Sequence, residues 1–376
     1  MLLTILPSEY DIFIGVDVDS KSYATTYRDH DNQGRSLKMP ADPLNLHSYF
    51  KKRFPDKRLL FAYEAGPTGY DLHDHLVKQG ESCIMVHPAG VPTAANSCVK
   101  TNRIDSLKLA EEAQSGKLKG IRVPSEAYRE LRHLVNLRQQ YATALKQAKQ
   151  RIKAFLLFEH IRLPDWASEK IWTSRWRFAL KQAALSPTHR FKMDLLLKDL
   201  DDARDRILLV LRQMRQFCAS QEAIAKNLTC LQSLPGFGFI VSTYFLARSG
   251  DPSHLKNVRE LGAFSGIVPR EYSTGDRVQK GHITHMGDRN LRRLLVEAAW
   301  VAIRKDGELA QFYSRIRSKR GQAGSRIAIV AVARKLTCRA YRVLKDQRPY
   351  KIHQFMKPSF EKEQELACLG RLDKSQ

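Results

Sequence analysis

The first 120 residues alternate between short apolar runs and amphipathic segments, and this order restricts the fold more than any other feature of the sequence. The run YDIFIGVDVDSKSYATTYRD (10–29) predicts a β-hairpin, and SLKMP (36–40) supplies a third strand. A helix, a buried strand, a second helix and a further strand then follow at residues 42–54, 58–65, 69–80 and 82–88. The sequence therefore predicts a layered α/β domain.

This order of strands and helices is that of an RNase H-like domain. The segment KTNRIDSLKLAEEAQSG (100–116) adds a helix that ends at a glycine. We place the domain at residues 10–122.

The pattern changes after residue 124. Two segments, 125–161 and 191–220, repeat apolar residues every three to four positions for longer than an ordinary globular helix. They predict a helical coiled-coil arm over residues 123–227. A mainly α-helical C-terminal domain then spans residues 228–350, and residues 351–376 form a tail.

Charge is distributed unevenly along the chain. Residues 1–110 hold 13 basic and 13 acidic residues, so the whole formal excess of +24 lies beyond them. Residues 270–350 hold 19 basic and 7 acidic residues, which is half of that excess. Such a concentration of basic residues in one part of the chain predicts a nucleic-acid partner. Because no apolar run reaches about 18 residues and no signal peptide is evident, we expect a cytoplasmic protein without a membrane partner.

Two carboxylates end strands that an RNase H-like sheet places side by side. Asp17 ends the first strand, with Asp19 as an alternative, and Glu64 ends the fourth. Asp105 lies in the first turn of the helix at 100–116. Clustered carboxylates raise one another's pKa unless a cation lies among them, and Mg²⁺ or Mn²⁺ prefers oxygen ligands. These acids predict a metal site for phosphoryl transfer, although strand-end acids more often cap turns or helices.

The segment LQSLPGFGFIVSTYFLA (231–247) has the form of a helix-hairpin-helix turn. Gly236 and Gly238 would shape the turn and leave backbone N–H groups free to hold phosphates without regard to base sequence. An ordinary Pro-Gly turn between core helices is the alternative.

The segment PREYSTGDRVQKGHITHMGDRNLRRLL (269–295) combines hydroxyl and basic side chains. Ser273 or Thr274 could attack a phosphodiester covalently, unless the Ser-Thr-Gly sequence is a structural turn. The cations that would bind nucleic acid and stabilise developing charge are Arg270, Arg277, Lys280, Arg289, Arg292 and Arg293. His282 and His285 have no third ligand nearby, so they predict no zinc site.

Six motifs between about residues 12 and 345 resemble, in sequence and order, a family of insertion-sequence transposases. In this family an N-terminal RuvC-like DEDD domain precedes a serine-bearing C-terminal transposase domain, and the Piv-type DNA invertases are relatives. The motifs are IGVDVDSK, YEAGPTGYDL, VKTNRIDSLKLAE, LPGFG, GIVPREYSTG and GHITHMGDRNLRRLLVEAAW.

The resemblance implies an arm used for dimerisation and one composite site of metal carboxylates and a serine that links covalently to DNA. It also implies guidance by a structured RNA encoded by the element. The four acids of the family fall on Asp17, Glu64, Asn102 and Asp105, so the third position is an amide here. The family's serine falls on Thr274, with Ser273 one residue earlier.

We therefore expect a DNA transposase or site-specific recombinase that acts as a dimer or tetramer on DNA, with a guide RNA as a further partner. One alternative is a metal-dependent nuclease or junction resolvase, which needs the carboxylates but no hydroxyl. Another is a decayed transposase that only binds nucleic acid, and Asn102 and Thr274 favour it. A sugar or metabolite kinase is a weaker alternative because no glycine-rich phosphate loop is evident.

Overall fold

The computed structural model describes residues 2–88, 102–168, 171–254, 257–271, 280–284, 286–319, 321 and 324–352. Contacts divide the chain into two compact units, Met1–Pro124 and Ser125–Gln376. The predicted nucleophile loop at 272–279 and most of the predicted tail lie outside the described residues.

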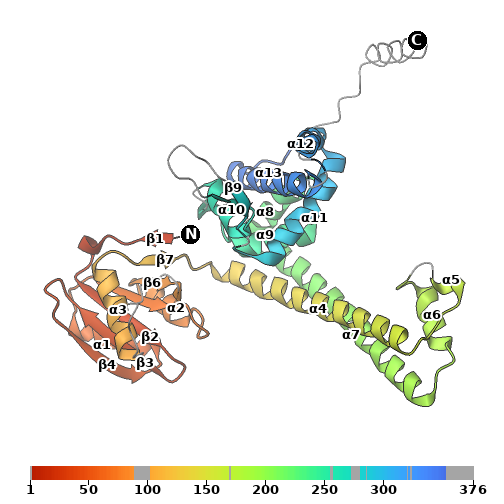
Figure 1. Ribbon diagram of the computed structural model, residues 1–376. Helices are drawn as coiled ribbons and strands as arrows, with labels where there is room; N and C mark the ends of the chain where they lie inside the picture. Colours follow the sequence, from red (N-terminus) through yellow and green to blue (C-terminus); the bar gives the residue numbers. More distant parts are fainter. Residues whose placement is uncertain are drawn as a thin grey trace, which may run out of the picture. The chain divides into compact units, whose positions relative to one another are not determined.

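The N-terminal unit is a mixed seven-stranded sheet with the order β1-β7-β6-β5-β2-β3-β4 (Figure 1). Its strands are β1 (Leu2–Thr4), β2 (Ile12–Val18), β3 (Ser22–Arg28), β4 (Gly34–Pro40), β5 (Leu59–Glu64), β6 (Ser82–Val86) and β7 (Lys119–Ile121). β2 runs parallel to β5 and antiparallel to β3. This is the α/β sheet that the sequence predicted, in the arrangement of an RNase H-like domain.

Helices cover both faces of this sheet because its central strands are apolar on both sides. The helices are α1 (Pro43–Arg53), α2 (Asp71–Lys78) and α3 (Asn102–Gln114). Ile14 and Val16 of β2 share a core with α1 and α2, whereas Phe13 shares a second core with α3. Asp42 caps α1 by accepting a hydrogen bond from the backbone N–H of Leu44.

The second unit begins with two long helices that pack against each other, α4 (Glu126–Phe158) and α7 (Pro187–Ser220). The C-terminal part of α4 packs on the N-terminal part of α7, so the two helices are antiparallel (Figure 1). Trp176 is buried in the core between them. The short helices α5 (Asp165–Ser168) and α6 (Ser174–Gln182) lie in the connection. The predicted coiled-coil character of this pair stays a prediction.

The remaining helices form the C-terminal body around α13 (Gly324–Asp346), which is buried along much of its length. The other elements are α8 (Glu222–Gln232), α9 (Phe239–Ser249), α10 (Val258–Ser265), β8 (Pro269–Glu271), β9 (Lys280–Ile283), α11 (Arg289–Lys305) and α12 (Gly307–Ser318). In the part of the chain that the structure describes, no helix combines the length and apolarity needed to cross a bilayer.

Candidate active site

Strand register places Asp17 and Glu64 beside each other at the carboxyl ends of two central strands of the N-terminal sheet. Val16 of β2 is opposite Tyr63 of β5 in a parallel ladder, and the two acids are the next residues along their strands. Side chains alternate between the faces of a strand. Because Phe13 and Ala62 face α3, Asp17 and Glu64 fall on that same face.

The helix α3 lies directly on this face because β2 has a glycine there. A Cβ atom on Gly15 would lie 2.0 Å from the backbone oxygen of Ser106, so no other residue fits without a backbone shift. The hydroxyl of Ser106 is also 2.9 Å from that of Thr26 on β3. The C-terminal part of α3 contacts the other end of these strands, where Gln114 donates a hydrogen bond to the backbone oxygen of Asp29. The first turn of α3 therefore lies toward the acids.

That first turn carries the remaining two predicted metal ligands. Asn102 is exposed at the start of α3, and Asp105 is half-buried one residue before the Ser106 contact. Three carboxylates and one amide are all oxygen donors, which suits Mg²⁺ or Mn²⁺. Among the described residues, however, no three His, Cys, Asp or Glu side chains are grouped as ligands for a metal ion.

Asp19, the sequence-based alternative to Asp17, lies beyond the end of β2. Its carboxylate accepts a hydrogen bond from the backbone N–H of Ser20 at 2.7 Å. Aspartates in turns commonly accept such a local hydrogen bond. The turn between β2 and β3 therefore accounts for an aspartate at position 19 without a role in metal binding.

The predicted helix-hairpin-helix turn joins α8 to α9. Gly236 has φ +86°, and a Cβ there would lie 2.2 Å from the backbone oxygen of Ala298 on α11. Gly238 is the N-cap of α9 and provides no side-chain cap, while the space beside it is open. Gly236 is thus required by packing, and Gly238 leaves the start of α9 accessible. A role of this turn in phosphate binding stays a prediction.

The proposed nucleophiles Ser273 and Thr274 lie outside the described residues, as do Arg277 and His285. The flanking strands β8 and β9 pair antiparallel, and Arg270 on β8 is exposed. The backbone of Lys280 belongs to β9.

A network of side chains holds the N-terminus of α11, the helix that carries Arg289, Arg292 and Arg293. Asp288 accepts a hydrogen bond from the backbone N–H of Leu291 and forms an ion pair with Arg248 of α9 at 2.8 Å. Arg248 also donates a hydrogen bond to the side-chain oxygen of Asn136 on α4, at 2.7 Å. Tyr244 donates to Asp288 as well, and burial is the main reason that its pKa is raised.

The sequence analysis did not identify this network around Asp288. Asp288 directly before the apolar pattern of α11 is an N-cap signal and could have been found. Its pairing with Arg248, 40 positions earlier, depends on how α9 and α11 pack.

The three arginines of α11 differ in their surroundings. Arg292 is half-buried, and its guanidinium donates to the backbone oxygen of Ser265 at 3.3 Å. Arg289 and Arg293 are exposed, and Arg293 pairs with Glu297 one turn later. Arg289 and Arg293 are therefore the more accessible candidates for phosphate contacts.

Two family profiles match the chain. The DEDD_Tnp_IS110 transposase domain covers residues 14–161, and the domain described as "Transposase IS116/IS110/IS902 family" covers residues 228–314. The first match contains the four positions Asp17, Glu64, Asn102 and Asp105. A DEDD transposase domain implies dependence on a divalent metal.

Individual relatives carry related names. "Putative transposase y4qE" of Sinorhizobium fredii is 31% identical over 65% of this chain and 58% of its own length. The "Transposase for insertion sequence element IS1533" of Leptospira borgpetersenii is 24% identical over 90% of this chain and 97% of its own length. The "Pilin gene-inverting protein" of Moraxella bovis is 27% identical over 40% of this chain and 47% of its own length. The chain thus spans somewhat over half of the first relative and nearly all of the second.

Proposed function

Because the chain carries two domains that match IS110/IS116-family transposase profiles, we propose that it cuts and rejoins DNA as a transposase or site-specific recombinase. The observation that carries this proposal is the register of β2 and β5, which brings Asp17 and Glu64 to one edge beneath the first turn of α3. Paired carboxylates at such an edge suit phosphoryl transfer better than a purely structural role.

Asp17, Glu64 and Asp105 would hold a divalent ion, Mg²⁺ or Mn²⁺, with Asn102 as a neutral oxygen donor. When bound, such an ion supplies charge stabilisation to the phosphoryl group. The amide of Asn102 lowers the negative charge of the set by one, so we expect weaker metal binding than a fourth carboxylate would give.

The hydroxyl of Ser273 or Thr274 would attack the phosphorus atom of a phosphodiester. A bond forms between the hydroxyl oxygen and phosphorus, and the bond from phosphorus to one deoxyribose oxygen breaks. The nucleophile loses its proton, and the released deoxyribose oxygen gains one. Attack on the adduct by a hydroxyl from another DNA strand restores the side chain and joins the new strand.

The C-terminal body would position the nucleic acid. Arg289 and Arg293 are exposed and supply charge, and the open N-terminus of α9 at Gly238 supplies backbone N–H groups. Arg270, Arg277 and Lys280 flank or lie within the proposed nucleophile loop. Arg292 also bonds within its own unit, so we expect it to contribute less.

We further propose that the protein works as a homo-oligomer, dimer or tetramer, and uses an element-encoded RNA as a second partner. The long α4–α7 pair supports the homo-oligomer, because Phe158 at the end of α4 and Phe191 near the start of α7 are largely exposed. The excess of basic residues beyond residue 110 supports the RNA partner, because it suits RNA as well as DNA.

Trapping of the covalent intermediate tests the proposal. The full chain is incubated with labelled DNA that carries the element ends, with Mg²⁺ or Mn²⁺ and any required RNA, and denaturing electrophoresis then detects a protein–DNA adduct. We expect the adduct in the wild type, and we expect Asp17→Asn to reduce it at least about 100-fold. Ser273→Ala and Thr274→Ala, made singly, identify the nucleophile because only one of them abolishes the adduct.

Three results would contradict parts of the proposal. If the Ser273→Ala, Thr274→Ala double variant recombines DNA normally, neither hydroxyl is the nucleophile. If that double variant cuts but never rejoins, and no adduct forms in the wild type, the protein is a metal-dependent nuclease or resolvase. Absence of cutting even after Asn102→Asp, with DNA binding intact, identifies a decayed transposase.

A further inference from the structure

A pocket of about 670 Å³ lies beside the C-terminal half of α13, and none of its lining residues belongs to the six family motifs quoted above. Its lining comes from α10, α12, α13 and the segment 348–351 that follows α13. Lining residues with charge are Glu308, Lys335, Arg339, Arg342, Asp346, Arg348 and Lys351. Five of these seven are basic, so the pocket favours an anionic ligand.

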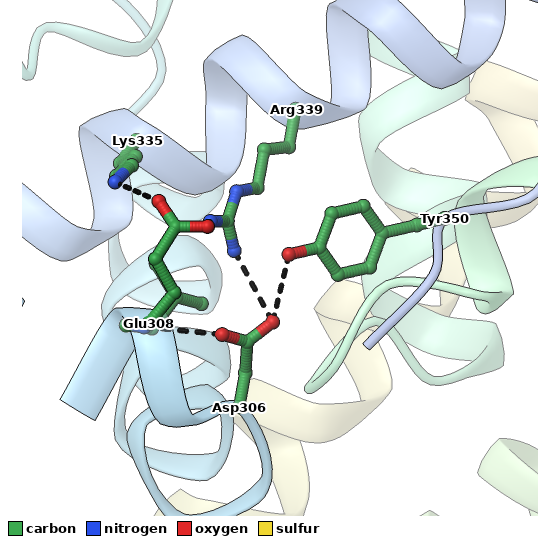
Figure 2. Close-up of polar contacts among 6 residues, drawn as sticks. Asp306, Glu308, Lys335, Arg339 and Tyr350 are labelled. Atoms are coloured by element: carbon green, nitrogen blue, oxygen red, sulfur yellow. Dashed lines mark hydrogen bonds and ion pairs between the residues drawn. The ribbon is translucent and has the colours of Figure 1, made fainter. Parts of the chain in front are cut away.

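A hydrogen-bond network fixes one wall of this pocket (Figure 2). Asp306 is fully buried, and its carboxylate accepts hydrogen bonds from the hydroxyl of Tyr350 at 2.7 Å and from the guanidinium of Arg339 at 3.3 Å. Glu308 pairs with Arg339 at 2.6 Å and with Lys335. The wall is therefore held in place by internal pairs, which occupy both Lys335 and Arg339.

The same network anchors the chain after α13. The backbone N–H of Tyr350 donates to the hydroxyl of Ser233 at 2.7 Å. Burial, followed by the bond to Asp306, raises the pKa of Tyr350, so its phenol stays a neutral donor. The segment 348–351 is thus anchored at Tyr350, which lowers the conformational entropy that the protein loses when a ligand binds there.

Three cations of the pocket are available to a ligand. Arg342, Arg348 and Lys351 are exposed, and they form no ion pair with any acid in the described ranges. Arg342 lies near the end of α13, and Arg348 and Lys351 lie on the segment after it, and all three line the pocket. Guanidinium groups in such positions match phosphate oxygens in geometry and charge.

The rest of the lining is apolar or aromatic. Val258, Val343 and Pro349 supply apolar surface, and the half-buried Tyr341 supplies an aromatic ring. The Arg339 guanidinium lies 4.8 Å from the centre of the Tyr350 ring, so one face of that ring is already covered. An apolar, aromatic hollow with a basic rim is the chemistry that binds an unpaired nucleobase and its flanking phosphates.

We propose that this pocket binds single-stranded nucleic acid, with an unpaired base against Tyr341 and backbone phosphates at Arg342, Arg348 and Lys351. The proposal takes its ligand class from the proposed function but needs no strand cleavage. A duplex keeps its bases stacked inside, so it offers this hollow only its backbone. DNA and RNA share the chemistry that the pocket recognises, and only measurement separates them.

Fluorescence anisotropy of the full chain with labelled oligonucleotides of about 12 nucleotides tests this inference. One arm uses single-stranded DNA, a second uses RNA of the same sequence, and a third uses the DNA duplex. We expect Arg342→Ala, Arg348→Ala to weaken single-strand binding about tenfold and to lower the salt slope by about 1.4, because two phosphate contacts are lost.

A matched control double variant distinguishes binding at this pocket from a general effect of positive charge. Arg326→Ala, Arg334→Ala removes the same amount of charge from α13, the helix that carries Arg342, at exposed positions outside the lining. We expect this control to weaken binding less than about twofold. Tyr341→Leu keeps apolar bulk without a π-face, and we expect about fivefold weaker binding with an unchanged salt slope.

The inference fails if both arginine pairs weaken binding equally, or if the duplex loses as much affinity as the single strand. It also fails if a polyglutamate peptide displaces the single strand through the same arginines, because the pocket would then be a site for acidic peptides. Whichever of DNA or RNA shows the larger pocket-dependent affinity is the physiological class. If these results hold while no adduct forms, the inference stands and the proposed recombinase activity does not.

Discussion

The N-terminal unit places its candidate carboxylates by backbone geometry, whereas the C-terminal unit fixes the start of its arginine-bearing helix α11 by side-chain contacts. Asp17 and Glu64 are neighbours because two parallel strands share a register, and α3 approaches them because Gly15 has no side chain. The helix α11, which carries Arg289, begins at the N-cap Asp288, and that carboxylate is held by Arg248 and Tyr244. The first arrangement tolerates little change in backbone position, and the second tolerates little change in polar side chains.

This difference suits what each unit is proposed to bind. A metal ion requires oxygen ligands within a few tenths of an ångström of their positions, and strands supply such precision. A nucleic-acid backbone is long and uniform, so exposed arginines on helices can contact it in several registers. Three predictions test the comparison, from the largest expected effect to the smallest.

Gly15→Val should destabilise the N-terminal unit most. The added Cβ would lie 2.0 Å from the backbone oxygen of Ser106, so α3 must move away from β2. We expect a loss of about 3 kcal/mol or more in the free energy of unfolding, measured by denaturant titration and by hydrogen exchange of β2 and α3. Gly66→Ala is the control, because its Cβ would meet only the backbone oxygen of Glu64, at 3.9 Å. Equal effects of the two substitutions would contradict placement by backbone contact.

Arg248→Met should destabilise the C-terminal unit by a smaller amount. It leaves the mostly buried carboxylate of Asp288 without its cation and breaks the bond to Asn136. We expect a loss of about 1–3 kcal/mol in the free energy of unfolding. Arg293→Met is the matched control, since its ion pair with Glu297 is about half exposed and is worth about 0–0.5 kcal/mol. If both variants unfold at the same denaturant concentration, the network around Asp288 does not order α11.

The smallest expected effect on stability concerns the ion pair of Asp11 and Arg58 on the surface of the N-terminal unit. The side chain and then the backbone N–H of Arg58 bond to Asp11 and lower its pKa from 3.8 to about 2. A lowered carboxylate pKa stabilises the fold above the unfolded value, and that contribution disappears as the pH falls from about 4 to about 2.

Arg58→Ala should therefore lower the Tm by about 1–2 °C at pH 6 and by nothing measurable at pH 2. Thermal unfolding followed by circular dichroism at both values measures this difference. Lys57→Ala, which removes a weaker charge interaction with Asp11, should show a smaller change. A Tm difference that persists unchanged at pH 2 would show that Arg58 acts through packing.

Much of the N-terminal fold could be predicted because its strands and helices are long enough to carry a period. The central strands and α1, α2 and α3 all lie where the sequence places them. The sequence analysis missed β1 (Leu2–Thr4) and β7 (Lys119–Ile121), because a strand of three residues is too short to show an alternating pattern. These two strands pair with each other only after α3 has returned the chain to the sheet. The carboxylates could be proposed as metal ligands because Asp17 and Glu64 lie near the ends of recognisable strands and Asp105 lies in the first turn of a helix, and their role stays a prediction.

The C-terminal network could not be predicted in the same way. Asp306 looks like an ordinary N-cap in the sequence, and it does accept a hydrogen bond from the backbone N–H of Leu309. Its burial and its bonds to Arg339 and Tyr350 arise only when α12, α13 and the segment after α13 pack together. Such contacts join positions more than 30 residues apart and leave no local pattern.

The sequence by itself determined the alternation of elements, the uneven charge and the family motifs, because each is a local or compositional property. Tertiary structure alone decided which face Asp17 and Glu64 share, why Gly15 and Gly236 admit no side chain, and which cations beside α13 are left without an acidic partner among the described residues. The physical reason is that strand register and helix packing set distances between residues far apart in the chain, and those distances decide where charges are paired.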